Sequence, residues 1–176
     1  MHTLRKIVVI GPESTGKSTL SESLAKHYDT AWCPEYAREY LVKNGKNYTF
    51  ENLLTIARGQ LSGEDAAAAQ ARHRLLFIDT DMYVMKVWSE FVFGKCDDWI
   101  LNQAANRKYD LYLLCNTDLP WVKDELREYP DLETRERLYT IYKDIMVNQS
   151  TPWVDISGNY EERLQKAITA IDKYIL

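Results

Sequence analysis

Short runs of apolar residues alternate with amphipathic stretches along the whole chain. Four of these runs fit buried strands of a parallel sheet, and a fifth, shorter run contains a proline that ends regular pairing. The runs cover residues 6–10, 75–81, 110–115 and 153–157, with the short one at 30–35. Strands that alternate with helices predict an α/β fold, in which right-handed crossovers place helices on both faces of a five-stranded parallel sheet.

The segments between these runs carry apolar residues at helical spacing. Helices are predicted after residue 18, over 36–43, 52–72, 82–93 and 97–107, around 138–145, and over 164–175. Inside the long segment 52–72, Gly59 and Gly63 indicate close packing against a neighbouring element. Because no repeat or linker interrupts the pattern, we expect one domain over residues 1–176.

Residues 11–18, with the sequence GPESTGKS, match the phosphate-binding P-loop pattern G-x-x-x-x-G-K-[ST]. A predicted strand precedes the motif and a predicted helix follows it. Glycines allow successive backbone N–H groups to face one anion, and the helix N-terminus adds its positive dipole end. In this motif Lys17 reaches the outer phosphates and the Ser18 hydroxyl ligates Mg²⁺. We therefore expect ATP and Mg²⁺ as cofactors, bound by Gly11, Glu13, Ser14, Thr15, Gly16, Lys17, Ser18 and Thr19.

Composition and charge narrow the class of partner. The net charge is −4 and the pI is near 5.4, which argues against nucleic acid. No apolar run approaches the length of a membrane span, and the first strand begins too early for a signal peptide. The three cysteines lack metal-ligand spacing. We expect a reduced, cytoplasmic protein that acts on a small molecule, with its oligomeric state left open.

Polar side chains follow the predicted strands at the sheet edge where ligands bind in such folds. They are Glu35, Asp79, Asp81, Asn116 and Asp118. Acids grouped in this way repel one another unless a cation or substrate hydroxyls lie between them. Asp79 follows four apolar residues, as a Walker B acid does, and is predicted to hold Mg²⁺ together with Ser18. Asp81 has three open roles: a metal ligand, a ligand of sugar hydroxyls, or the cap of the next helix.

Glu35 is the candidate general base, since a kinase needs an acceptor that orients and deprotonates the attacking hydroxyl. Arg38 lies three residues later on the same helix face. It either contacts the transferring phosphate or orients Glu35 by a charge-assisted hydrogen bond. The alternative is a surface ion pair of little energetic value.

The most charged segment, 123–137, lies between two core elements, and residues 118–137 are predicted to form a short helical lid. It carries four cationic side chains, Lys123, Arg127, Arg135 and Arg137. Phosphoryl transfer gains from a cation laid over the transferring group, and Arg127 is the first candidate for this catalytic role. The alternative is a solvated helix face.

Several aromatic residues lie near strand ends or on the helices that leave them: Trp32, Tyr36, Tyr83, Trp88 and Trp121. An aromatic clamp at that place suits a flat heterocycle, charged or neutral. Core packing is the alternative for each of them. The residues assigned to the substrate are Glu35, Tyr36, Arg38, Asp81 and Trp88.

The remaining motifs distinguish between classes of P-loop protein. A GTPase needs Asp-x-x-Gly after the third strand and Asn-Lys-x-Asp after the fourth, whereas this chain has DTDM at 79–82 and CNTD at 115–118. A short chain with acids at its strand ends and an arginine-bearing lid favours a small-molecule kinase.

Five motifs in order then resemble the NadR-type ribosylnicotinamide kinase domain. They are GPESTGKSTL at 11–20, CPEYAREYL at 33–41, IARGQ at 56–60, LLFIDTD at 75–81 and DLPWVKDELRE at 118–128. The resemblance covers nearly the whole chain and implies a nucleoside-kinase-like P-loop fold. It implies ATP-dependent phosphorylation of nicotinamide riboside at its 5′-hydroxyl, giving nicotinamide mononucleotide for NAD biosynthesis. Larger NadR proteins also carry DNA-binding and adenylyltransferase segments before the kinase, so only the kinase activity is expected here.

Two alternatives stay open at this point. The acceptor is another nucleoside or a small alcohol, or the protein is a nucleotide-dependent binding or signalling module without turnover.

Overall fold

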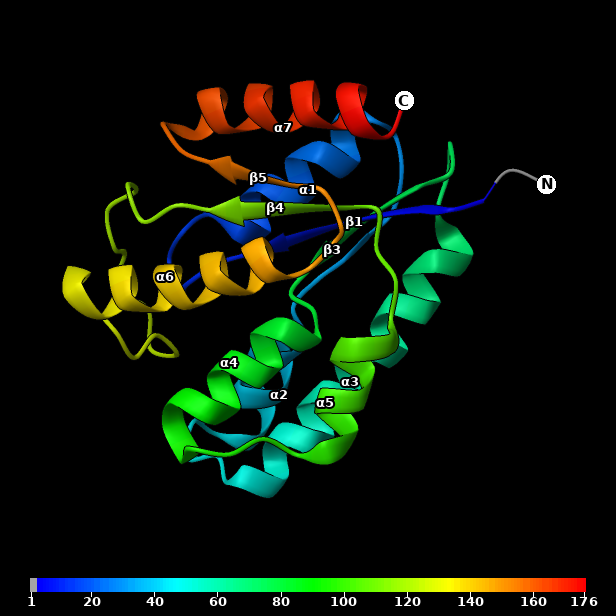
Figure 1. The fold of residues 1–176 in the computed structure, drawn as a ribbon. Helices are drawn as coiled ribbons and strands as arrows, with labels where there is room; N and C mark the ends of the chain where they lie inside the picture. The colour runs from blue at the N-terminus through cyan, green and yellow to red at the C-terminus, as the bar shows by residue number, and fades with distance from the viewer. Residues whose placement is uncertain (1–2) are drawn as a thin grey trace.

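A parallel β-sheet forms the centre of the molecule (Figure 1). The computed structural model describes residues 3–176. In chain order the elements are β1 (Arg5–Ile10), α1 (Lys17–His27), β2 (Trp32–Cys33), α2 (Tyr36–Asn44), α3 (Phe50–Gln70), β3 (Leu75–Asp79), α4 (Met82–Phe93), α5 (Asp98–Asn106), β4 (Leu111–Cys115), α6 (Leu132–Asn148), β5 (Trp153–Ile156) and α7 (Tyr160–Tyr174).

The five strands lie in the order β2-β3-β1-β4-β5, and every neighbouring pair is parallel. β1 is therefore the central strand, with Val9 beside Asp79 of β3 and Ile10 beside Leu114 of β4. Alternate residues of β1 point to opposite faces of the sheet, and from Ile7 to Ile10 the residues on both faces are fully buried. This burial on both faces explains the nearly continuous apolar runs of the sequence, and the predicted five-stranded α/β fold is confirmed.

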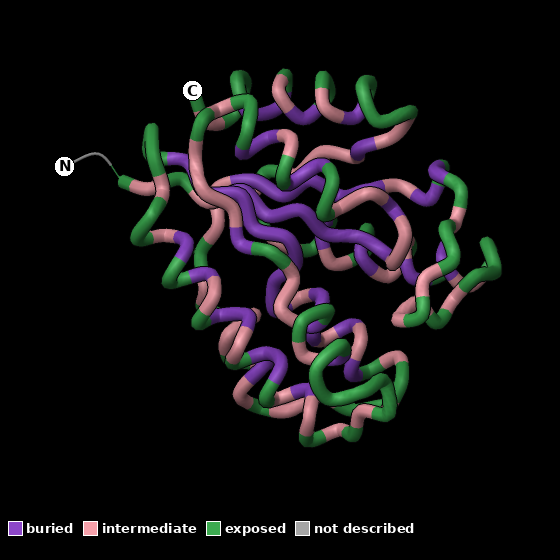
Figure 2. The backbone as a smooth tube through the Cα atoms, turned by 180° about the vertical axis from the view of Figure 1, so that it is seen from behind, coloured by how far each residue is buried: buried purple, intermediate pink, exposed green. Residues whose placement is uncertain are grey.

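Helices cover the two faces of the sheet in separate layers. Ile7 and Val9 pack with α1 and α7, whereas Val8 and Ile10 pack with α4 and α6. A further apolar cluster joins α2, α3, α4 and α5, which gather below one end of the sheet in Figure 1. Burial follows these layers, since β3, β4 and most of β1 are buried, the edge strand β5 is mostly of intermediate burial, and the outer helix faces are exposed (Figure 2). Within residues 3–176, no helix has both the length and the apolar character needed to cross a bilayer.

Two segments differ from the sequence prediction. β2 has only two paired residues, because Pro34 follows it and has no N–H group to donate. The stretch between β4 and α6 contains bends and a turn but no helix, so the predicted lid is a loop followed by the first turns of α6. This connection between β4 and α6, residues 116–131, is the 116–131 loop.

The predicted close packing at Gly59 is confirmed. A Cβ atom at this position would lie 2.0 Å from Cε1 of Tyr36, so α2 approaches α3 only because residue 59 has no side chain. A Cβ atom at Gly63 would lie 3.6 Å from the Cys33 sulfur, which is an ordinary van der Waals contact.

Candidate active site

The P-loop connects the central strand β1 to α1 and curls around the N-terminus of that helix. Gly11 has φ 142° and Gly16 has φ 79°, a backbone region that favours glycine. A Cβ at Gly11 would lie 2.8 Å from the Cys115 carbonyl oxygen. The Thr15 hydroxyl donates to the Pro12 carbonyl at 2.7 Å and closes the loop. The motif therefore has the curled backbone and the helix N-terminus of a phosphate site.

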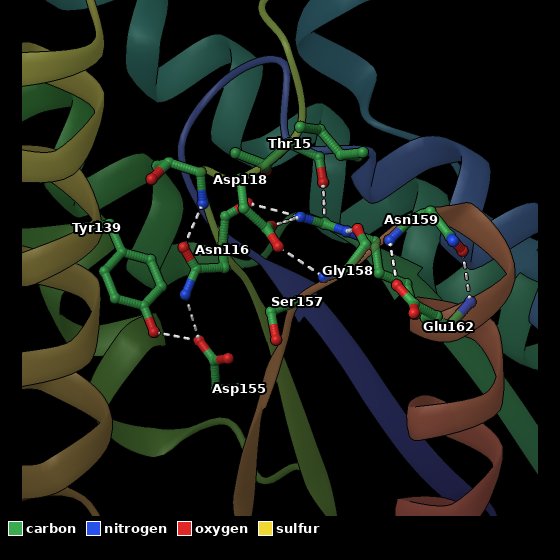
Figure 3. A network of polar contacts seen from close by, with 12 residues as sticks. Thr15, Asn116, Asp118, Tyr139, Asp155, Ser157, Gly158, Asn159 and Glu162 are labelled. Atoms are coloured by element: carbon green, nitrogen blue, oxygen red, sulfur yellow. Dashed lines mark hydrogen bonds and ion pairs between the residues drawn. The ribbon is translucent and has the colours of Figure 1, made fainter.

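A buried arginine of α7 holds the P-loop against the neighbouring strand ends. Arg163 is 2% exposed and donates to the carbonyl oxygens of Thr15 at 2.7 Å, Gly158 at 2.7 Å and Asn116 at 2.9 Å. It also pairs with the Asp118 carboxylate, which accepts the Gly158 N–H. Figure 3 shows this network around Thr15, Asn116, Asp118 and Gly158. The ends of β1, β4 and β5 are thus joined through one guanidinium group.

A cavity of about 260 Å³ opens beside the P-loop. Its walls come from the P-loop, the start of α2, the cavity-facing side of α4, the 116–131 loop, α6 and the first residue of α7. The main lining residues are Gly11–Thr19, Glu35, Arg38, Tyr48, Val84, Val87, Trp88, Phe91, Val122, Leu126, Arg127, Glu128, Tyr129, Leu138, Tyr142 and Tyr160. One cavity therefore brings the phosphate loop together with Glu35, Arg38, Trp88 and Arg127 of the sequence prediction.

Asp79 lies at the carboxyl end of β3 and is fully buried. Its Oδ2 accepts a hydrogen bond of 2.5 Å from the Ser18 hydroxyl. Burial raises the pKa of Asp79 to about 6 and the nearby Glu35 carboxylate adds to this rise, while Lys17 and the Ser18 hydrogen bond oppose it. The two predicted metal ligands are therefore in direct contact, each presenting oxygen at the foot of the P-loop.

Asp81 serves as the N-cap of α4. Its Oδ1 accepts from the backbone N–H groups of Tyr83 at 3.0 Å and Val84 at 3.3 Å, and its Oδ2 accepts from the Tyr112 hydroxyl at 3.0 Å. Burial raises the pKa of Asp81 to about 7, against the effect of these hydrogen bonds. The carboxylate does not line the cavity. Of the three roles that the sequence left open for Asp81, the hydrogen bonds support helix capping.

Glu35, Tyr36 and Arg38 begin α2 but have different surroundings. Glu35 lines the cavity and makes no side-chain hydrogen bond to its own helix. Tyr36 packs against Gly59 of α3 instead of lining the cavity, so the contacts do not support its assignment to the substrate. Arg38 lines the cavity and pairs with Asp124 of the 116–131 loop at 2.6 Å. This pairing was not predicted, because the two residues lie far apart in the sequence.

The 116–131 loop is fastened to the side chains of the P-loop. The Glu13 carboxylate accepts from the backbone N–H groups of Glu128 at 3.0 Å and of Tyr129, and Ser14 Oγ accepts from the Val122 N–H at 3.0 Å. Burial raises the pKa of Glu13, while the two backbone hydrogen bonds and Lys17 lower it. The predicted lid therefore lies over the phosphate loop.

The four cationic residues of segment 118–137 have separate positions. Arg127 lines the cavity and donates to the Val122 carbonyl at 2.6 Å. Arg135 is 4% exposed, and its guanidinium group makes one long hydrogen bond of 3.4 Å, to the Leu119 carbonyl. Arg137 lies over the Phe91 ring at 5.5 Å, and Lys123 is exposed. Only Arg127 is exposed to the cavity, in agreement with its choice as the first candidate.

Trp88 is joined to Tyr48, an aromatic residue that the sequence analysis did not identify. Its Nε1 donates to the Tyr48 hydroxyl at 2.9 Å, and that hydroxyl donates to the Glu128 carboxylate at 3.0 Å. All three residues line the cavity. Burial raises the pKa of Tyr48, so its hydroxyl stays a donor at neutral pH. By contrast, Trp32 packs against the core cluster beneath α1 and α7, and Tyr83 packs against Tyr112.

A central strand, a P-loop and a helix within a five-stranded parallel sheet, with a cavity at the carboxyl ends of the strands, define a P-loop fold of the nucleoside-kinase type. The family model described as "AAA domain" (AAA_28) matches residues 6–163, and the chain belongs to that family.

Comparison with known proteins gives similarity to NadR. The chain is 24% identical to the trifunctional NAD biosynthesis/regulator protein NadR of Escherichia coli (strain K12), over 96% of this chain and 42% of that protein. The chain thus spans less than half the length of this curated relative. A crystal structure of NadR in complex with NR has a TM-score of 0.78 at 21% identity, covering 98% of this chain and 52% of the other. A structure of NadR with NAD and AMP-PNP has a TM-score of 0.73 at 23% identity, over 97% and 49%.

Proposed function

We propose that this protein is an ATP- and Mg²⁺-dependent kinase that phosphorylates nicotinamide riboside at its 5′-hydroxyl, giving nicotinamide mononucleotide and ADP. The observation that carries the proposal is the single cavity in which the P-loop meets the free carboxylate of Glu35 and the polar aromatic group of Trp88 and Tyr48. The similarity to NadR, with one structure in complex with NR and another with AMP-PNP, supports both substrates.

The donor half of the site is the P-loop with Lys17. Backbone N–H groups of residues 13–18 and the N-terminus of α1 stabilise the phosphates, and Lys17 adds a positive charge near the transferring group. Lys17 lies at the cavity, where its ammonium donates to the Pro12 carbonyl at 2.8 Å. A nucleoside triphosphate is the ligand that this arrangement suits.

The acceptor half provides a base and a cation. The Glu35 carboxylate takes the proton of the attacking hydroxyl, whose oxygen then forms a bond to the γ-phosphorus. The bond from that phosphorus to the β,γ-bridging oxygen breaks, and ADP leaves with the electron pair. Among the cations that line the cavity, Arg38 is paired with Asp124, and Arg127 is the one assigned to stabilise charge on the transferring group.

The chemistry of the acceptor wall fits the pyridinium ring of nicotinamide riboside. That ring is flat and cationic, so it gains from an aromatic face and from nearby carboxylates. The cavity presents Trp88 and Tyr48 together with the carboxylates of Glu35 and Glu128. An uncharged base would lack this charge attraction to the two carboxylates.

The ligand set for the metal fits Mg²⁺. Ser18 Oγ and Asp79 Oδ2 are hard oxygen ligands next to the phosphate loop. Mg²⁺ is usually held by one or two protein oxygens, water and the phosphates of its nucleotide, so a larger protein cage is not required. When bound, the ion would neutralise charge on the phosphates. The proposal keeps the cytoplasmic location that the sequence analysis expects.

An ADP-release assay tests the proposal directly. The protein is incubated with ATP, Mg²⁺ and each member of a nucleoside panel that includes nicotinamide riboside, and the product is identified by mass. We expect ADP release with nicotinamide riboside, and loss of turnover with retained ATP binding for Glu35→Gln. Release only with another nucleoside or a small alcohol would replace the proposed acceptor. Release with none would favour a nucleotide-dependent binding module.

A further inference from the structure

Two carboxylates of the proposed reaction stand at the ends of adjacent strands. Glu35 follows β2 and Asp79 ends β3, and these strands pair through Cys33 and Ile78. Their mutual repulsion contributes to the raised pKa of Asp79. Two like charges in a partly buried site hold a useful arrangement only where other groups fix the backbone that carries them.

One side chain of α3, Gln60, bonds to both of these strand ends. It is 1% exposed and uses both ends of its amide group. Its Oε1 accepts the Tyr36 N–H at 2.8 Å, directly after Glu35. Its Nε2 donates to the carbonyls of Asp79 at 3.2 Å and Thr80 at 3.0 Å. The amide therefore links the segment after β2 to the segment after β3.

The side chain of Glu35 is free of its own helix. Glu35 is the N-cap residue of α2, where a short polar side chain accepts from the second or third of the unpaired N–H groups of the first turn. Its carboxylate makes no such bond and lines the cavity instead. Gln60 reaches the first of these N–H groups because Gly59, with no side chain, lets α2 lie directly against α3.

The contacts with β3 hold a strained turn. Thr80 has φ 80°, a backbone conformation that is strained for a β-branched residue. This turn lies between Asp79, which bonds to Ser18, and Asp81, which caps α4. Hydrogen bonds to the carbonyls on either side of the Thr80 nitrogen and α-carbon keep the backbone in that conformation.

We infer that Gln60 is a positioning residue for the phosphoryl-transfer reaction: by binding the Tyr36 N–H and the carbonyls of Asp79 and Thr80, it keeps the carboxylates of Glu35 and Asp79 in the places where they act. The inference rests on the proposed kinase activity. Gln60 itself does not line the cavity, so it acts through Glu35 and Asp79 and not on the substrate.

The test is a double-mutant cycle with Gln60→Met and Glu35→Gln. Methionine keeps the length of the side chain and removes its hydrogen bonds. We expect kcat to fall by about 10- to 100-fold in Gln60→Met, the loss typical of a small misplacement of a reacting group, with the KM for ATP nearly unchanged. In the Glu35→Gln background, Gln60→Met should cause a clearly smaller loss than in the unmodified protein, because only its effect through Asp79 remains.

Amide hydrogen exchange is a second readout that does not depend on turnover. The peptide containing Tyr36 should exchange faster in Gln60→Met, since its N–H loses an acceptor. Ser89→Ala is the matched control: Ser89 is fully buried, donates to the Lys95 carbonyl at 2.7 Å and lies outside the cavity lining. It should change neither kcat nor exchange at Tyr36. If Gln60→Met is insoluble, Gln60→Asn shortens the same amide and should give the same pattern.

Additive losses in the cycle, an unchanged kcat, or unchanged exchange at Tyr36 would each overturn the role of Gln60. Absence of ADP release from the unmodified protein with every nucleoside would instead remove the proposed function. The exchange measurement would still report on the Gln60 contacts in that case, so the two failures are distinguishable.

Discussion

Replacing Arg163 by methionine should loosen the whole phosphate-binding end of the sheet. The guanidinium group is buried and donates to three backbone carbonyls, those of Thr15, Asn116 and Gly158. Methionine fills similar space and donates to none of them. The variant therefore leaves three carbonyls without this partner and removes the cation that pairs with Asp118.

The magnitude follows from what each group loses. The Asp118 side chain is 40% exposed, so it regains water when the pair is broken and contributes little to the loss. The carbonyls are less accessible, and hydrogen bonds to a charged donor contribute about 1.5–3 kcal/mol each. Removing one partner of a buried ionic network typically costs about 3–5 kcal/mol, and we expect Arg163→Met to fall in this range. For a domain of this size, that loss lowers Tm by roughly 10 °C.

Thermal unfolding followed by circular dichroism measures this loss, and nucleotide titration shows whether the P-loop is affected. Lys143→Met is the matched control, because it removes one positive charge from an exposed helix face. Arg163→Lys should lie between the control and Arg163→Met, since an ammonium group keeps the charge but cannot reach all three carbonyls. A Tm for Arg163→Met within about 2 °C of the control would refute the reasoning, as it would correspond to less than about 1 kcal/mol.

Four further predictions concern the cavity and its support. Lys17→Ala should lower kcat by about 100- to 1000-fold in the ADP-release assay, because a positioned cation is removed; full activity would place catalysis elsewhere. Arg127→Ala should reduce kcat more than it weakens ATP binding, and an effect on affinity alone would make Arg127 a binding residue. Trp88→Ala should raise the KM for nicotinamide riboside, whereas unchanged kinetic constants would assign Trp88 to packing. The pKa of Asp81 is about 7 in the folded protein and 3.8 ordinarily, so between these pH values only the folded state keeps the proton of this carboxyl group. The free energy of unfolding should therefore fall as the pH rises from about 4 to 7. Urea unfolding should show Asp81→Asn flattening that profile, and an unchanged slope would contradict the assignment.

Local sequence patterns were sufficient to predict the fold and the position of the P-loop. A buried strand is a continuous run of apolar residues in the sequence, so such runs were enough to predict all five strands. The P-loop is likewise continuous in sequence, and its glycines are required by positive φ at residues 11 and 16. Asp79 was found because an acid that directly follows a buried strand has no role in the core.

The groups that support the site were not predictable in the same way. Gln60 and Arg163 lie inside helices, and nothing in their local sequence says that their polar ends meet strand ends far along the chain. Tyr48 lies in a connection where an aromatic residue has no periodicity to interpret. For Tyr36 the sequence prediction was not supported. Its position near a strand end suggested that it lines the cavity, but the lack of a side chain at Gly59 lets its ring pack against α3.

In this chain, the side chains of Glu13 and Ser14 give the P-loop a structural role in addition to phosphate binding. In the motif these positions are variable, since phosphate binding uses their backbone N–H groups and not their side chains. Here the two side chains accept hydrogen bonds from the backbone of the 116–131 loop, at Val122 and at Glu128 and Tyr129. That loop carries Arg127 and Glu128 to the acceptor half of the cavity. The side chains at these variable positions of the phosphate loop therefore fix the 116–131 loop, and with it Arg127 and Glu128, beside the cavity.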